Sequence, residues 1–291
     1  MIITGAAAGL AAAFNTPLGG IVFAIEELTK NHLKYLRTTV FSAVIIAGFT
    51  AQTILGPYLV FGYPKVNPDG ISFFFLIILT SIICGIVGAY FGVMAFNLNR
   101  FRKKLKKIPQ FIFGFIMVII ACLLVFFTNE DSVGAGNLLL DRLLFDSDKT
   151  VEWYTLPTRL INGLISFTNG GAGGIFAPAL SFGGTIGSVI GELFQLKPRQ
   201  VNMLVLIGMV GFLTAFTRSP FTSAVLVLEM TDRHSVIFYF MFAALIASLI
   251  ANTIDKQSFY ERTAKSIGDS LPDIKPIKNK KSSDISINQE S

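Results

Sequence analysis

The segment that most constrains this chain is a glycine-rich break inside a stretch long enough to cross a membrane. Residues 170–178 read Gly-Gly-Ala-Gly-Gly-Ile-Phe-Ala-Pro, and they lie within the uncharged run 160–191. Such a run of glycine cannot hold a stable helix, and irregular backbone at membrane depth survives only where protein buries it or where it lines a cavity. A helix restarting at Ile175 would direct its free N–H groups and its positive dipole end into the break, where an anion is the natural guest. A flexible hinge or a close glycine contact is the alternative interpretation.

The composition and the uncharged runs predict an all-α polytopic membrane protein. Of the 291 residues, 52% are hydrophobic and 14% are charged, which is too apolar for an ordinary soluble domain. Shorter apolar pieces at 6–25 and 201–228 are interrupted by glycine, proline and charge, which is typical of half-helices that meet inside a transporter. Uncharged runs of about the 20 residues that a spanning helix needs cover 38–64, 71–97, 110–129, 160–191 and 235–254.

The placement of charge favours a lipid bilayer, and not nucleic acid, as the partner of this chain. The formal net charge is +6, and basic residues crowd the segments 30–37 and 100–107. The segments 62–70 and 129–149 are nearly neutral or acidic on balance. This alternation follows the positive-inside rule and predicts that both basic loops are cytoplasmic. Binding of lipid head groups is the simplest local role for these lysines. The polar residues 269–291 are predicted to form a disordered cytoplasmic tail.

A weak internal repeat relates the beginning of the chain to a segment near its end. An offset of 203 residues places Pro17 on Pro220 and Glu26 on Glu229, and it also pairs Gly5 with Gly208, Leu10 with Leu213, Ala12 with Ala215 and Val22 with Val225. Repeats built from short, interrupted helices are typical of two-fold transporter folds, which hold the substrate between their halves.

These segments together resemble one family of membrane proteins. The run 170–178, the segment 4–28 (TGAAAGLAAAFNTPLGGIVFAIEEL) and the segment 208–232 (GMVGFLTAFTRSPFTSAVLVLEMTD) occur in the order in which the CLC family of chloride channels and chloride/proton antiporters carries its motifs. The resemblance extends from Thr4 to about Tyr260. It implies a CLC-type inverted-repeat helical bundle with broken half-helices, chloride and protons as the transported ions, no cofactor, and a homodimer.

The resemblance also implies where the anion binds. The backbone N–H groups of Gly174, Ile175 and Phe176 match the family's ligands for the central chloride. Backbone donors suit chloride because they supply several weak hydrogen bonds without a full positive charge that would trap the ion. Tyr260 resembles the tyrosine whose hydroxyl donates to the same ion from the cytoplasmic side. A tyrosine at the membrane interface is the alternative for this residue.

Two adjacent glutamates end the first copy of the repeat, and the repeat separates their roles. Glu26 has a mate in Glu229, which favours a structural acid that pairs with backbone or with a cation near a helix end. Glu27 has no acidic mate, because Met230 occupies the matching position. Its place in the motif resembles the family's internal proton-transfer glutamate, which is typical of antiporters. A surface acid that offsets Lys30 is the alternative for Glu27.

The first copy of the repeat is expected to be partial. A glycine break equivalent to 170–178 would fall upstream of Met1, and neither the Gly-Ser-Gly-Ile-Pro nor the Gly-Arg-Glu-Gly-Pro segment of the family occurs in this sequence. We therefore expect a remnant of the first inverted repeat at 1–64, the second repeat with a terminal helix at 65–268, and the tail at 269–291. A bacterial inner or plasma membrane is the expected location.

Three functions remain open on the sequence. A chloride/proton antiporter subunit is favoured by Glu27, a passive chloride channel of the same family is second, and a non-transporting remnant that needs a separate N-terminal half is third. An enzyme is not expected, because no nucleophile lies beside a base and no glycine loop opens a soluble phosphate site. Cys84 and Cys122 are interpreted as packing residues within apolar spans, and no metal-ligand spacing involves them.

Overall fold

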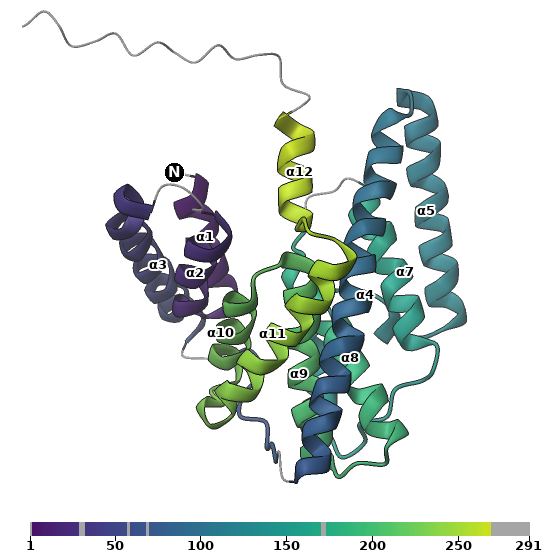
Figure 1. Cartoon of the computed structure of the whole chain (residues 1–291). Coiled ribbons are helices and arrows are strands. Elements are labelled where there is room, and N and C mark those ends of the chain that lie inside the picture. Colours follow the sequence, from purple (N-terminus) through teal and green to yellow (C-terminus); the bar gives the residue numbers. More distant parts are fainter. Residues whose placement is uncertain (1, 29–32, 57–58, 68–69, 170–172, 269–291) are drawn as a thin grey trace, which may run out of the picture.

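The computed structural model describes residues 2–28, 33–56, 59–67, 70–169 and 173–268, and within these ranges the chain is helical (Figure 1). The first group of helices comprises α1 (Ile2–Phe14), α2 (Pro17–Phe23), the π-helix η1 (Ala24–Leu28) and α3 (Leu33–Leu55). The second comprises α4 (Ile71–Lys104), α5 (Lys107–Phe127), η2 (Glu130–Ser132), α6 (Asn137–Phe145), α7 (Thr155–Thr168), α8 (Phe176–Leu193), α9 (Pro198–Thr217), α10 (Pro220–Thr231), η3 (His234–Val236), α11 (Ile237–Ile254) and α12 (Phe259–Gly268). The predicted all-α class is confirmed.

Within the described residues, five helices are long and apolar enough to cross a bilayer. These spans are Thr38–Leu55, Phe73–Lys104, Lys107–Phe127, Pro198–Thr217 and His234–Ile254. The uncharged run 160–191 is not a continuous helix, because it divides into α7 and α8 at the predicted break. The interruption at 201–228 leaves a 20-residue helix, α9, before the short helix α10, and the sequence pattern alone had suggested two half-helices.

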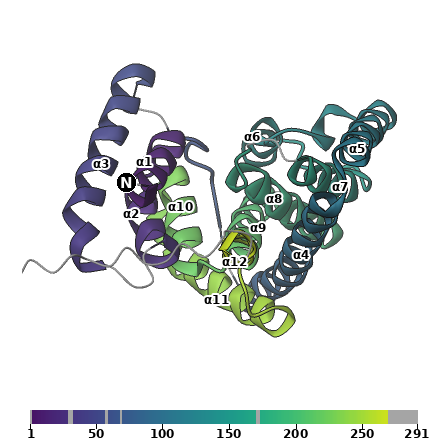
Figure 2. The ribbon, with the colours of Figure 1, turned by 90° about the horizontal axis from the view of Figure 1, so that it is seen from above.

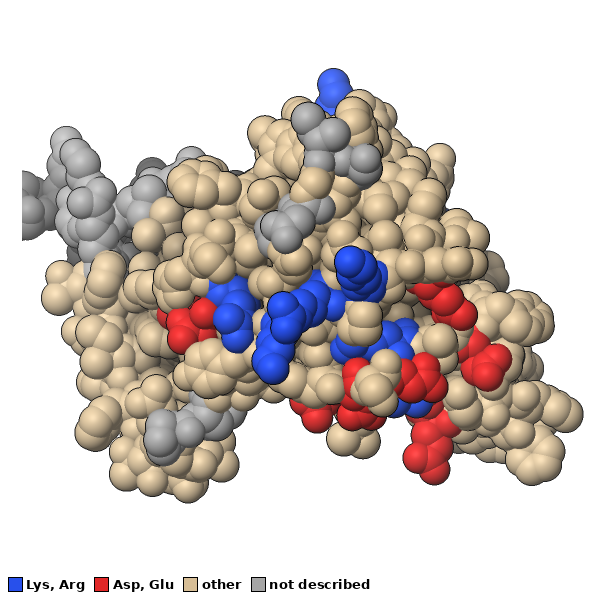
Figure 3. All heavy atoms as spheres, turned by 90° about the horizontal axis from the view of Figure 1, so that it is seen from below, with Lys and Arg blue, Asp and Glu red and all other residues tan. Residues whose placement is uncertain are grey.

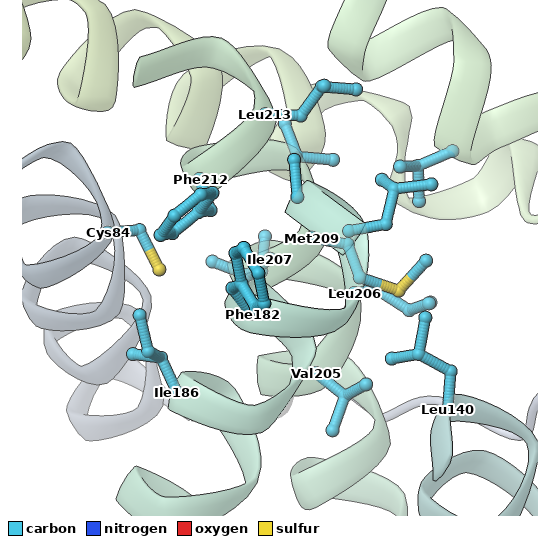
Figure 4. Packing of buried hydrophobic residues seen from close by; sticks show 14 of the residues in the cluster. Cys84, Leu140, Phe182, Ile186, Val205, Leu206, Ile207, Met209, Phe212 and Leu213 are labelled. Carbon is cyan, nitrogen blue, oxygen red and sulfur yellow. The ribbon is translucent and has the colours of Figure 1, made fainter. Parts of the chain in front are cut away.

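Helix α9 is the centre of the larger group of helices. Its residues from Val201 to Thr217 are all buried, and α4, α8 and α11 pack around it. Figure 4 shows this core, in which the Phe182 ring of α8 lies beside the Phe212 ring of α9, Ile186 of α8 lies toward Cys84 of α4, and Met209 of α9 lies toward Leu140 of α6. A helix that is apolar on every side needs such a complete cover of other helices.

The contact between α8 and α9 depends on glycine. Gly183 and Gly187 of α8 lie against the backbone of α9 at Leu204 and Gly208, so closely that a β-carbon at any of the three glycines would overlap backbone atoms of the opposite helix. Small residues at helix contacts allow this close approach of two backbones in membrane proteins. The glycines therefore fix the distance between α8 and α9, and thereby the position of the α8 N-terminus.

The predicted internal repeat is present in the backbone conformation. Asn15 ends α1 with φ 52°, and its mate Arg218 ends α9 with φ 63°. The next residue has φ −125° and ψ 75° in the first copy and φ −118° and ψ 78° in the second, and a proline then begins α2 or α10. Left-handed backbone is uncommon outside glycine, so its recurrence at the same repeat position shows that both copies share one helix–break–helix unit.

The view from above shows how the two copies meet (Figure 2). Helices α1, α2 and α3 form a group at one side, and α2 packs against α10 of the second copy. The α4–α5 turn and α12 lie at the same end of the molecule (Figure 1). The proposed boundaries at residues 64 and 268 stay a prediction, and the tail 269–291 lies outside the described residues.

The face opposite α12 carries charge that the loop sequences did not reveal. Figure 3 shows lysine and arginine side chains gathered at the middle of this face, with acidic side chains beside them. Lys65 and Lys149 from two separate loops and Arg199 from the first turn of α9 line one hollow there, of about 330 Å³. Counting charges loop by loop missed this group, because Lys65, Lys149 and Arg199 belong to segments that are far apart in the sequence.

Candidate anion site at a broken helix

The N-terminus of α8 is open at the predicted break. Ile175 is the N-cap with φ −99° and ψ −19°, and α8 begins at Phe176, one residue later than predicted. The Ala179 N–H donates to the Ile175 carbonyl at 3.1 Å, and Pro178 has no N–H to offer. No described side chain caps this end. The first-turn N–H groups therefore remain available to a ligand, as the anion hypothesis requires.

The structure buries part of this end and exposes the rest. Ile175 and Phe176 are each 9% exposed, whereas Gly173 and Gly174 are exposed. Residues 170–172 of the glycine run lie outside the described residues. The apolar side chains of Ile175 and Phe176 keep one side of the break dry, where hydrogen bonds to an anion are stronger than in water.

An aromatic contact brings Tyr260 to the same place. The Phe23 ring lies 5.3 Å from the Phe176 ring and 6.2 Å from the Tyr260 ring, measured between centroids. Phe14 at the end of α1 also contacts Phe176, at 6.4 Å. Four helices thus meet around the pair Phe23 and Phe176, and the structure places Tyr260 and Phe176 in one aromatic cluster although they are far apart in the sequence.

The environment of Tyr260 suits a hydrogen-bond donor. Burial, with a smaller contribution from the Glu27 carboxylate, raises the pKa of the Tyr260 phenol above its ordinary value. The hydroxyl therefore stays protonated over the physiological pH range. A protonated, partly buried phenol can donate to an anion and cannot repel it by a charge of its own.

Glu27 lies on the same side of the molecule, within η1. Its carboxylate accepts hydrogen bonds from the Ser219 hydroxyl at 3.1 Å and from the Ser258 hydroxyl at 3.2 Å. Ser219 lies in the α9–α10 break, and Ser258 precedes Tyr260 by two residues. Glu27 therefore connects the first repeat to the segment that carries Tyr260. Short π-helical turns such as η1 are frequent at functional sites.

Glu26 has the structural role predicted for it, because its carboxylate pairs with backbone groups at a helix end. Its carboxylate accepts from the N–H groups of Phe221 and Thr222, at 3.1 and 2.7 Å, and from the Thr222 hydroxyl at 2.7 Å. In the other copy, Glu229 accepts from the N–H groups of Leu18 and Gly19 at 3.0 and 2.6 Å. Each glutamate thus caps the N-terminus of the short helix in the opposite repeat. A carboxylate at the end of one helix can cap the start of the other only if α2 and α10 run antiparallel.

A cavity of about 620 Å³ adjoins the α8 N-terminus. It lies between α5, α7, α8 and the loop before α6, and Gly173, Gly174, Ala177 and Pro178 form part of its wall. Arg159, Asn162, Ser166 and Asn169 also line it, and their spacing of three and four residues places them on one face of α7. The sequence reasoning missed these residues, although a polar stripe with this spacing in an apolar run is a detectable signal.

The two cysteines differ in their surroundings. Cys84 is fully buried in the core, as predicted, but Cys122 is exposed on α5 and lines the cavity, so the prediction that it is a packing residue was wrong. The sequence around Cys122 is apolar and therefore suggested burial. In the structure, however, α5 has no buried side chain. Among the described residues, no group of three or more histidine, cysteine or acidic residues could hold a metal ion.

The fold and the site together define an inverted-repeat membrane protein with broken helices. The family profile described as voltage gated chloride channel matches residues 1–252. The chain therefore belongs to this family, the CLC family, as the motifs predicted.

Relatives and solved structures agree with the assignment to this family. The chain is 28% identical over 269 residues to the H(+)/Cl(-) exchange transporter ClcA of Salmonella arizonae, covering 89% of this chain and 57% of the relative. It is 31% identical over 285 residues to ClcA of Yersinia pestis bv. Antiqua, covering 89% and 56%. A slow cyanobacterial Cl−/H+ antiporter has a TM-score of 0.79 at 25% identity, covering 91% of this chain and 64% of that one. A CLC-type fluoride/proton antiporter shares the fold, with a TM-score of 0.76 at 21% identity over 90% of this chain and 64% of that one. The chain thus spans less than two thirds of the length of these proteins.

Proposed function

We propose that this chain takes part in chloride transport across a membrane, as a subunit of a chloride/proton antiporter. The observation that carries the proposal is the convergence of an uncapped helix N-terminus at Ile175 and Phe176 with the Tyr260 phenol around one aromatic cluster. Chloride is the substrate, and the chemistry of its binding needs no cofactor. Gly174 contributes to the same end of α8.

Proton coupling is proposed to run through Glu27. Its carboxylate lies between two serine hydroxyls near Tyr260, in a partly buried position where a carboxyl group can take and release a proton. The names of the relatives, which describe proton/chloride exchange, support the same function. We further propose a homodimer in a bacterial inner or plasma membrane, with α12 and the C-terminus on the cytoplasmic side.

Replacing Glu27 tests the proposed coupling. In vesicles that carry the full chain, Glu27→Gln should stop proton movement and leave chloride efflux, because the amide cannot titrate but can still bond to Ser219 and Ser258. The measurement is simultaneous chloride efflux and pH change. Chloride movement without protons in the unaltered chain would favour the channel of the same family. No flux at all would favour the non-transporting alternative that needs a separate N-terminal half.

Replacing Tyr260 tests the proposed anion site. Tyr260→Phe keeps the ring contacts with Phe23 and Phe259 and removes only the hydroxyl. A neutral hydrogen bond contributes on the order of 1 kcal/mol, so chloride should bind about fivefold more weakly in calorimetric titrations. Tyr63→Phe, at an exposed tyrosine on the opposite face, is the control and should bind as the unaltered chain does. Equal chloride affinity in both variants would favour the alternative, in which Tyr260 is a tyrosine of the membrane interface and not an anion ligand.

A further inference from the structure

A groove with a basic end and an apolar floor runs along α5. It has a volume of about 560 Å³, and its polar end is formed by Arg102 of α4, Lys107 of α5 and Asn169 at the C-cap of α7. This polar end lies at the α4–α5 turn, on the same side of the molecule as α12 (Figure 1). The remaining lining residues all belong to α5 and are Gln110, Phe111, Gly114, Phe115 and Val118. The groove is therefore amphipathic along the helix axis.

The length of this groove corresponds to one leaflet of a bilayer. Lys107, Phe111, Gly114 and Val118 are spaced by three or four residues, so they share one face of α5. At 1.5 Å per residue, Lys107 and Val118 are about 16 Å apart along the axis, and half of the hydrocarbon core of a bilayer is about 15 Å thick. Helix α5 stands at the edge of the molecule (Figure 1, Figure 2), and within the described structure none of its side chains is buried. The floor of the groove is therefore open to the acyl chains of one leaflet.

The basic end of the groove has no acidic partner in the helices that form it. The segment 71–128, which contains α4 and α5, includes six arginines and lysines at 100–107 and no aspartate or glutamate, and α7 has no acidic residue either. Nη1 of Arg102 donates to the Asn169 carbonyl at 2.8 Å, whereas its Nε is buried without a partner among the described residues. A buried donor without an acceptor is costly, above all on a charged group. An anionic oxygen at this place would remove that cost.

Asn169 and Gly114 complete the polar end. The Asn169 Oδ1 is buried without a partner among the described residues, and it lies 3.6 Å from the position that a β-carbon on Gly114 would take. Glycine at 114 thus leaves the groove open directly below the polar groups. A headgroup that carries a phosphate and a hydroxyl would satisfy the Arg102 Nε as acceptor and the Asn169 Oδ1 as donor.

We propose that this groove binds one anionic phospholipid from the leaflet on the α12 side. The phosphate lies beside Arg102 and Lys107, and one acyl chain runs along Phe111, Gly114 and Val118. The unpaired positive charge selects an anionic headgroup over a zwitterionic one. The apolar floor selects a lipid over a soluble anion, because burial of an acyl chain is favourable in proportion to the apolar area covered. This binding needs neither chloride nor protons, so it is separate from the proposed transport function.

Native mass spectrometry of the purified full chain in detergent tests this site. The protein is mixed with equal amounts of phosphatidylglycerol and phosphatidylcholine that carry the same acyl chains, and we expect one phosphatidylglycerol per chain to be retained in preference. Arg102→Gln combined with Lys107→Gln should weaken its binding about thirtyfold, because each basic residue near an anionic headgroup contributes roughly a factor of five. Lys65→Gln combined with Arg199→Gln is the matched control. It removes the same charge from exposed positions on the opposite face and should bind the lipid as the unaltered chain does.

A second variant tests the floor of the groove without a change of charge. In Gly114→Leu, the β-carbon meets only the Asn169 Oδ1 among the described atoms, at an ordinary contact distance, and the rest of the side chain occupies the groove. We expect phosphatidylglycerol to bind several-fold more weakly, whereas Ile116→Phe, which adds bulk to α5 outside the groove, should leave binding unchanged. Glycerol phosphate, which has the charge without acyl chains, should not displace the lipid. Equal retention of the two lipids, equal losses in the two double variants, full binding by Gly114→Leu, or displacement by glycerol phosphate at the lipid's own concentration would overturn the proposal.

Discussion

Gly208→Ala should destabilise the protein by about 3 kcal/mol or more, at the upper end of what overpacking costs. The added β-carbon would overlap the Gly183 carbonyl group on the opposite helix, and backbone atoms cannot rotate away as a flexible side chain can. Helices α8 and α9 would have to separate, which would disturb the core between them. We expect a large loss of unfolding free energy in mixed micelles titrated with denaturing detergent.

The repeat supplies a matched control for this substitution. Gly5 is the mate of Gly208, but no atom lies within 4 Å of the place where its β-carbon would be. Gly5→Ala should therefore be neutral or stabilise α1 by up to about 1 kcal/mol, because alanine is the better helix former. A similar loss of stability in both variants would show that helix geometry, and not the α8–α9 contact, is the cause.

Removing either of the reciprocal caps should produce the second large effect. Glu26→Ala leaves two N–H groups of α10 without their acceptor, and Glu229→Ala does the same to α2. Hydrogen bonds to a charged group contribute about 1.5–3 kcal/mol, and the favourable interaction with the helix dipole is lost as well. We expect each variant to lose about 2–4 kcal/mol of unfolding free energy.

Glu152→Gln is the control for the caps, because Glu152 is exposed and its carboxylate caps no helix within the part of the chain that the structure describes. Surface changes of this kind usually stay within about 0.5 kcal/mol. If Glu26→Ala were as mild as Glu152→Gln, water would be replacing the cap, and the interpretation of Glu26 as a structural acid would be wrong.

The sequence predicted those parts of the fold that depend on local pattern. The break before Ile175 follows from glycine content, four of the five spans follow from uncharged runs, and the capping role of Glu26 follows from an offset that can be read by eye. The full burial of α9 could not be predicted, because it results from three other helices packing around it. The position of Phe23 between Phe176 and Tyr260 could not be predicted either, because it joins helices that are remote in the sequence.

The cavity and the charge of Arg159 were missed for a related reason. In the sequence, Arg159 stands at the edge of an apolar run, where a residue facing the membrane surface is the usual interpretation. Only the fold shows that its hydrogen bonds go to a loop some 25 residues earlier and to α8. Cys122 misled in the opposite direction, because an apolar helix with no fully covered side chain has the composition of a buried one.

The exchange of caps between α2 and α10 has a consequence for how the protein is made. The N–H groups of Leu18 and Gly19 donate to the Glu229 carboxylate, which lies 211 and 210 residues later in the sequence. At about 5–20 residues per second, synthesis takes roughly 10–40 seconds to reach it. During that interval α2 lies in the membrane or its insertion machinery with an uncapped end. The α1–α2 pair therefore cannot reach its final, capped state until the ribosome has synthesised α10.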